Sequence, residues 1–195
     1  MKEILAYLDV DYRNKISCFL YSSIQDKHNN GLLGGTTCYA MPSQEMIVAV
    51  YNPPHEVYGV GAHEIVHIVV YWTIGIHASD MLAEGIAVAF ENHYCNNIPP
   101  HQASAYYLQN GLLKPLEIMF DNRAWVDVMN KNSELYYNQA GSFVKYLVDT
   151  YGIRPFKSFY TRASKAAYKQ AFSEYYGRAI TEFYEDWLNF LQNIP

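Results

Sequence analysis

The chain has 195 residues, half of them apolar, and a formal net charge of −5. A single domain spanning 1–195 is the default at this length, and the apolar content suffices for a sizeable core. The mild acidity and the lack of a basic run give nucleic-acid binding no electrostatic support, so we expect no nucleic-acid partner.

The first third of the sequence predicts a short amphipathic helix over residues 2–9, followed by a small sheet. Runs of β-branched and aromatic residues predict strands at 16–21, 36–40 and 46–51. The first run is mostly apolar, so we expect it at the centre of the sheet. Turn signals separate the runs, and we expect a mostly antiparallel sheet.

Residues 60–75, VGAHEIVHIVVYWTIG, predict a helix with no polar face, which has to be surrounded by protein. His63, Glu64 and His67 lie in its middle, and a buried charge or imidazole without a partner is costly. Residues four apart on a helix share one face, so His63 and His67 point two imidazoles at a common spot beside Glu64. This H-E-x-x-H order is typical of zinc metallopeptidases, with two nitrogen ligands and a carboxylate general base.

The alternative interpretation is a pair of core histidines bonded to the backbone or to Glu64. The otherwise apolar helix around the pattern favours the metal site. A catalytic zinc takes three protein ligands and leaves one position for water. The metzincin pattern fails, because it requires Gly at position 70 and His at position 73, where this chain has Val70 and Thr73. Four candidates for the third ligand remain: Glu84, His77, Glu91 and His93.

Glu84 is the preferred third ligand. It lies in the middle of an apolar helix predicted over 80–94, beside the small residue Gly85, which allows close packing on a neighbouring helix. The short connection before this helix makes it an antiparallel neighbour of the metal helix and brings Glu84 back towards His67. Glu91 fits better as a hydrogen-bond partner of an imidazole, or as a merely solvated carboxylate.

Beyond residue 95 the sequence predicts a helical part, 96–195, in which residues 114–132 are loop with short helical turns. Five helices are expected there, at 101–113, 134–151, 155–162, 164–176 and 181–192. The predicted fold class is therefore α+β. A small N-terminal sheet packs on the metal helix within residues 1–95, and the helical part follows.

Cys18, Cys38 and Cys95 are odd in number, widely spaced and outside any C-x-x-C motif, so we expect buried free thiols and a reducing compartment. The acidic residues near the start argue against a signal peptide. The longest apolar run, 65–76, is too short to span a bilayer. We expect a soluble protein, cytoplasmic as given, or secreted or surface-exposed if a signal segment has been removed. The sequence leaves the oligomeric state open.

Two segments together resemble the gluzincin pattern. HEIVH at 63–67 is followed by MLAEGIAVAFE at 81–91, which matches H-E-x-x-H with a downstream Glu in a W-L-x-E-G-x-A context. The segment 136–152, YYNQAGSFVKYLVDTYG, resembles the tyrosine helix of the same group. The chain is similar to the peptidase MA-like family, small relatives of the aminopeptidase N and thermolysin folds. Met81 stands where relatives often carry Trp, and the spacing from His67 to Glu84 is slightly shorter than in thermolysin.

The resemblance implies a zincin-like fold and a zinc metallopeptidase that acts on a peptide or protein substrate. It implies one Zn²⁺ held by His63, His67 and Glu84, with Glu64 as the general base. No clear G-x-M-E-N segment of the aminopeptidase N kind is present, which favours an endopeptidase.

The resemblance further implies an edge strand, either 46–51 or 36–40, that binds extended peptide as an added strand. Gly34-Gly35 would let the adjoining loop approach substrate, or would form an ordinary turn. The same resemblance implies that Tyr137 rather than Tyr136 donates a hydrogen bond to the oxyanion.

The sequence leaves three other functions open. The first is an idle metal- and peptide-binding module, which the intact Glu64 disfavours. The second is a metal-dependent hydrolase of small amides, since the sequence does not show the width of a cleft. The third is a purely structural helical protein, which the buried polar residues disfavour.

Overall fold

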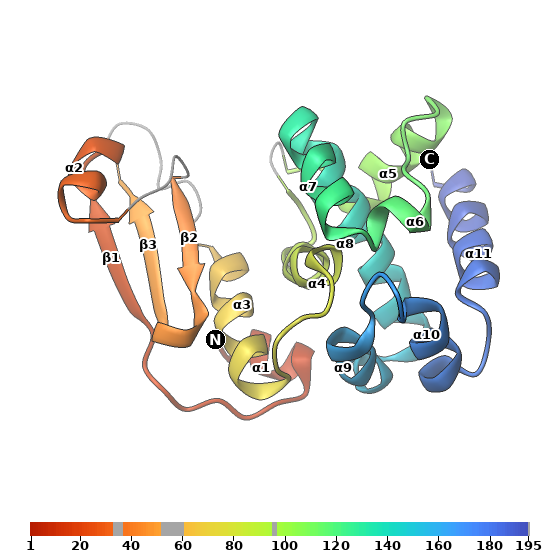
Figure 1. The fold of residues 1–195 in the computed structure, drawn as a ribbon, viewed down its shortest axis with the longest axis horizontal. Coiled ribbons are helices and arrows are strands. Elements are labelled where there is room, and N and C mark those ends of the chain that lie inside the picture. Colours follow the sequence, from red (N-terminus) through yellow and green to blue (C-terminus); the bar gives the residue numbers. More distant parts are fainter. Residues whose placement is uncertain (33–36, 52–60, 95–96, 195) are drawn as a thin grey trace. The chain divides into compact units, whose positions relative to one another are not determined.

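The computed structural model describes residues 1–32, 37–51, 61–94 and 97–194 (Figure 1). The chain forms two compact units, Met1–Gly75 and Ile76–Pro195, and each is described by itself. The described residues are α+β and mostly helical, with eleven α-helices and one three-stranded sheet. The units divide at Gly75, whereas we expected an internal division at residue 95; the number of domains stays a prediction.

The first unit contains the sheet. Its elements are α1 (Lys2–Leu8), β1 (Ser17–Tyr21), α2 (Ile24–Asn29), β2 (Cys38–Met41), the short 3₁₀ helix η1 (Pro42–Gln44), β3 (Met46–Val50) and α3 (Ala62–Thr73). The strand order is β1-β3-β2, with β1 parallel and β2 antiparallel to β3. The expectation of a mostly antiparallel sheet is therefore wrong for one of the two pairings.

The direction of each strand follows from its connection. β2 and β3 are joined by η1 and by Glu45, whose left-handed backbone (φ 51°) completes a tight reversal, so these strands run antiparallel. β1 is separated from β2 by α2 and a longer connection, which allows a crossover, and it pairs with the far side of β3 in the same direction. The sequence carries turn signals but no signal for this crossover.

The prediction that the strand at 16–21 lies at the centre of the sheet was also wrong. β3 lies in the middle, and its Ile47, Val48 and Ala49 are buried. β1 lies at an edge of the described sheet, where Phe19 is 45% and Leu20 is 58% exposed. Both strands are apolar, so composition alone does not decide which one is central.

The predicted packing of the sheet on the metal helix is confirmed within the first unit. α3 contacts β2, β3, η1 and α1. Val66, Ile68 and Val69 of α3 are fully buried. At the C-terminal end of α3, the Trp72 indole donates a hydrogen bond to the Pro42 carbonyl oxygen at 2.9 Å, which ties the helix to the β2–β3 connection.

The second unit is helical throughout its described elements. They are α4 (Asp80–Glu91), α5 (Pro100–Gln109), α6 (Leu116–Met119), α7 (Asn122–Lys131), α8 (Ser133–Tyr151), α9 (Ile153–Arg162), α10 (Tyr168–Tyr176) and α11 (Ile180–Gln192). Residues 114–132 were predicted as loop with short helical turns. The four-residue α6 fits that prediction, but the ten-residue α7 does not, so the prediction was wrong for 122–131. Asp121 caps α7, and Trp125 and Val128 form its buried side.

α8 is the central helix of this unit and contacts α4, α5, α7 and α9. Glycines allow α4 and α8 to pack closely against each other, as predicted for Gly85. A Cβ added to Gly85 would lie 2.5 Å from Val144 Cγ2, and one added to Gly141 would collide with Val88.

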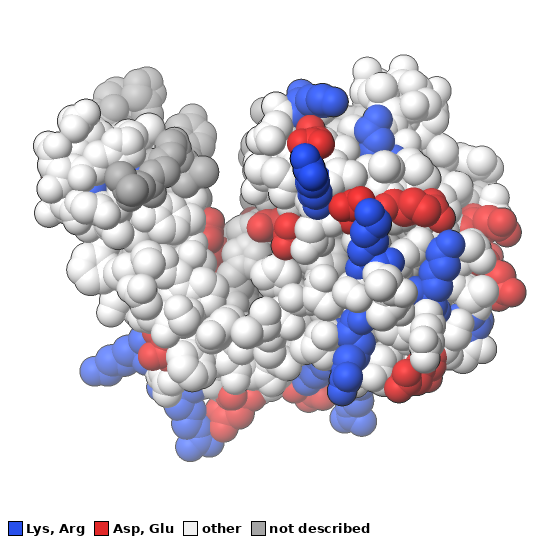
Figure 2. All heavy atoms as spheres, in the orientation of Figure 1, with Lys and Arg blue, Asp and Glu red and all other residues white. Residues whose placement is uncertain are grey.

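Acidic and basic side chains lie beside one another on the second unit in the view of Figure 2. Two of the ion pairs of the second unit join Lys165 to Asp121, and Lys169 to Glu117 at 3.4 Å. None of the helices in the described part of the chain combines the length and the apolar character that crossing a bilayer requires.

Candidate metal centre

α3 presents its two histidines as the helical spacing predicts. The rings of His63 and His67 lie one turn apart, with centroids 4.8 Å from each other and planes at 77°. Both side chains and Glu64 are half-buried, whereas Val66, Ile68, Val69 and Val70 are fully buried. Trp72, near the end of the helix, is 49% exposed, which corrects the expectation that protein surrounds the helix on every side.

Glu64 lies in the first turn of α3. A carboxylate is favoured there by the unpaired backbone N–H groups of the helix N-terminus. A side-chain hydrogen bond also joins Glu64 to Cys38 of β2. No pattern in the sequence predicts this contact, because the two residues lie far apart along the chain and share no motif.

Glu84 lies on α4, in the second unit. Glu84 is half-buried, whereas all the remaining residues from Met81 to Ala89 are buried. Its charge acts on two buried phenols of the same unit. Burial, and after it the charge of Glu84, raises the pKa of Tyr136 on α8 and of Tyr160 on α9. Tyr160 is a neighbour of Glu84 that the sequence pattern did not reveal.

The two tyrosines proposed as oxyanion donors have different surroundings. Tyr137 is half-buried and stacks on Tyr94, with ring centroids 4.0 Å apart. Tyr136 is only 3% exposed and stacks on Trp125 at 4.7 Å. The charge of Glu84 acts on the Tyr136 phenol, so both residues have to be compared by substitution.

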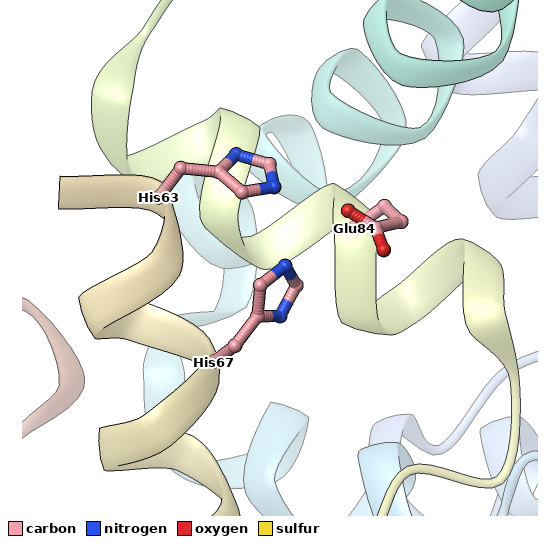
Figure 3. A group of neighbouring side chains, drawn as sticks. All are labelled: His63, His67 and Glu84. Atoms are coloured by element: carbon pink, nitrogen blue, oxygen red, sulfur yellow. The ribbon is translucent and has the colours of Figure 1, made fainter. Parts of the chain in front are cut away.

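Among the described residues, one group of side chains offers three metal ligands within reach of one another: His63, His67 and Glu84 (Figure 3). One ligand atom from each lies within 4.8 Å of the others. Two imidazoles and one carboxylate are a donor set used for catalytic zinc. Since α3 and α4 belong to different units, a metal centre that joins them is a proposal and not a property of either unit.

The other candidates for the third ligand have separate surroundings. His77 Nε2 lies 3.1 Å from Asp80 Oδ1, and its ring meets that of Tyr160 edge-on. His93 is exposed and follows the end of α4, while Glu91 is half-buried in its last turn. None of these three belongs to the group of potential ligands found in the described residues.

The described strands narrow the choice of peptide-binding edge. β3 (Met46–Val50) is paired on both sides, so it is excluded as an edge. β2 (Cys38–Met41) pairs on one side with β3 and is the remaining candidate. The start of the predicted strand 36–40, at Thr36, and the Gly34-Gly35 pair lie outside the described residues.

Among the described residues, Cys18 and Cys38 form no disulfide, as predicted, but neither is fully buried. Cys18 is exposed because β1 lies at the edge of the sheet, and Cys38 is half-buried. Cys95 lies outside the described residues.

No protein-family model, curated protein or solved structure matches the chain. The function is therefore inferred from the donor groups themselves and from their spacing.

Proposed function

We propose that the chain is a zinc metallopeptidase of the gluzincin type, with a zincin-like fold. The observation that supports this most is the grouping of His63, His67 and Glu84, whose ligand atoms lie within 4.8 Å of one another. These residues would hold one Zn²⁺. When bound, the metal supplies Lewis acidity at this position.

The protein side chains supply the remaining chemistry. Glu64 precedes the second histidine by three residues and is not one of the three ligands, so its carboxylate is available as a general base. It accepts a proton from the attacking water and returns it to the leaving amine. Tyr137 donates a hydrogen bond to the carbonyl oxygen as negative charge develops there. An extended peptide bound along β2 would present its backbone to these groups.

The test is digestion of fluorescein-labelled casein by the full chain, before and after treatment with a chelator and then after re-addition of zinc. We expect cleavage that is lost with the metal and restored by it. The matched control is Glu64→Gln, which keeps the size of the side chain and removes its basicity, and should bind zinc without cleaving. Casein digestion by Glu64→Gln at the parental rate would contradict the proposal. Stoichiometric zinc without cleavage of any member of a peptide library would favour the idle binding module.

A further inference from the structure

Cys38 and Glu64 meet inside the first unit. Cys38 is the first residue of β2, and its backbone is fixed opposite Ala49 by pairing with β3. α3 packs on β2, and the two side chains share a hydrogen bond. The contact therefore joins a strand of the sheet to the helix that carries the H-E-x-x-H residues.

The sheet presents two cysteines on one face. Cys18 is opposite Ile47, and Cys38 is opposite Ala49. Residues two apart on a strand point to the same side, so the two thiols share a face of the sheet but belong to strands separated by β3. Cys18 is exposed at the edge, which makes it a matched control for a cysteine at the contact with Glu64.

The thiol is held as a hydrogen-bond donor. Burial raises the pKa of Cys38 to about 12, with the charge of Glu64 as the next cause. At neutral pH the sulfur therefore keeps its proton, and a thiol is a donor to a carboxylate. The thiolate form that acts as a nucleophile or as a metal ligand is disfavoured at this position.

A donor fixed on a strand restricts the carboxylate that it holds. A glutamate side chain has several rotamers, and a general base is effective only within hydrogen-bond reach of the proton that it accepts. Both sides of this contact are anchored, Cys38 by strand pairing and α3 by its packing on the sheet and by the Trp72–Pro42 hydrogen bond.

We propose that Cys38 is a positioning residue for Glu64: its S–H group holds the carboxylate in one orientation on the helix that carries the two histidines. The consequence for catalysis rests on the proposed function, because it takes Glu64 to be the general base. The contact itself does not depend on activity, and it is tested separately.

The first experiment measures the contact through the thiol. In a Cys18→Ser, Cys95→Ser background of the full chain, the rate of alkylation by iodoacetamide is followed from pH 7 to pH 10. Glu64→Gln removes the neighbouring charge, so we expect alkylation at pH 9 to become about tenfold faster, equivalent to one unit of pKa. The control Glu3→Gln, on α1, should leave the profile unchanged. Identical profiles with Glu64 and with Gln at that position would overturn the proposal, whether or not the protein is a peptidase.

The second experiment measures the effect on the base. Cys38→Ala should lower kcat on casein about ten- to a hundredfold, the range seen when a supporting hydrogen bond is removed from an active site. KM and zinc content should stay at the parental values. Cys38→Ser, which restores a donor, should recover most of kcat, and Cys18→Ala should be unaffected.

Parental kcat in a folded Cys38→Ala variant would overturn the positioning role. Equal losses in Cys38→Ala and Cys38→Ser would also overturn it, since a loss that a restored donor does not recover is not due to the hydrogen bond. Thermal melting of each variant separates these outcomes from loss of fold. An inactive parent protein would count against the proposed function alone, because the alkylation profile still decides whether Cys38 holds Glu64.

Discussion

Gly85 of α4 lies so close to α8 that a Cβ at this position would be 2.7 Å from the carbonyl oxygen of Ala140. A backbone atom cannot move aside as the end of a flexible side chain can, so the close approach of the two helices requires glycine here. The residue next to Glu84 is therefore a structural requirement of the second unit, and it fixes the helix on which the proposed third ligand lies.

Gly85→Ala should destabilise the fold. Alanine is the better helix former by about 1 kcal/mol, yet overpacking against α8 costs about 1–3 kcal/mol, so we expect a net loss in the free energy of unfolding. Urea denaturation of the parent and the variant measures it. Adding Val144→Ala removes the nearest methyl group, at 2.5 Å, and should reduce the cost of the Gly85→Ala change. An unchanged urea midpoint in Gly85→Ala would contradict this prediction, because it would mean that α4 and α8 accommodate the added methyl group without a net loss of stability.

The proposed zinc ligands can be tested one at a time by metal analysis. His63→Ala, His67→Ala and Glu84→Gln should each lower zinc content from about one equivalent to near zero after dialysis, because a site with two protein ligands is incomplete. His77→Ala is the matched control, since this histidine already pairs with Asp80. It should keep the parental zinc content. Loss of zinc in His77→Ala with retention in Glu84→Gln would assign the third ligand to the connection before α4.

His101 should make the stability of the second unit depend on pH. Burial, and then the charge of Lys145, lowers the pKa of this imidazole to about 4. Its Nδ1 lies 2.8 Å from Ser142 Oγ, which also accepts a hydrogen bond from the Trp187 indole at 3.1 Å. With one donor already bound to the oxygen, the serine O–H is free to donate to an unprotonated Nδ1, so the pair fits a neutral imidazole.

The sign of the pH effect follows from the two pKa values. The unfolded chain takes up a proton near pH 6.5, whereas the folded chain does so near pH 4. Stability from the neutral imidazole is therefore complete above pH 6.5 and falls as the pH drops towards 4. Allowing for partial exposure, we expect a loss of about 1 kcal/mol between pH 7 and pH 5 in urea denaturation. His101→Asn keeps an acceptor and has no such titration, so its loss over the same interval should be smaller.

The local features of the fold followed from the sequence more readily than the order of its parts. The H-E-x-x-H spacing predicts the neighbouring rings of His63 and His67, because the period of a helix fixes which residues share a face. The small size of Gly85 likewise predicts that it lies at a contact between helices. It does not say which helix is contacted, and the partner is α8.

The features that the sequence did not predict depend on contacts between distant segments. The exposed position of β1 is set by the crossover that inserts β3 into the middle of the sheet. The hydrogen bond between Cys38 and Glu64 depends on how α3 packs on β2, which no spacing encodes. Helix α7 was missed although Trp125 and Val128 are spaced as on one face of a helix and Asp121 has the side chain of a good N-cap.

Tyr137 is proposed as the oxyanion donor, and Tyr136 is its rival on the same helix. Neighbouring residues of a helix point about 100° apart, so only one of the two phenols is able to face a given site. The half-buried Tyr137 retains a route to substrate, and its stacking on Tyr94 holds the ring in place. Tyr136 is buried against Trp125, and its pKa responds to Glu84.

Tyr137→Phe keeps the ring and removes only the hydroxyl, so kcat on casein should fall about 10²- to 10³-fold, the usual cost of losing one oxyanion donor. KM and zinc content should change little, because the bond forms mainly in the transition state. Tyr94→Phe preserves the stacked pair and is the control, expected to keep parental kcat. If Tyr136→Phe causes the loss while Tyr137→Phe remains active, the donor is the buried phenol near Glu84. Such a result would shift the assignment by one residue without changing the ligand set, since neither tyrosine is a proposed metal ligand.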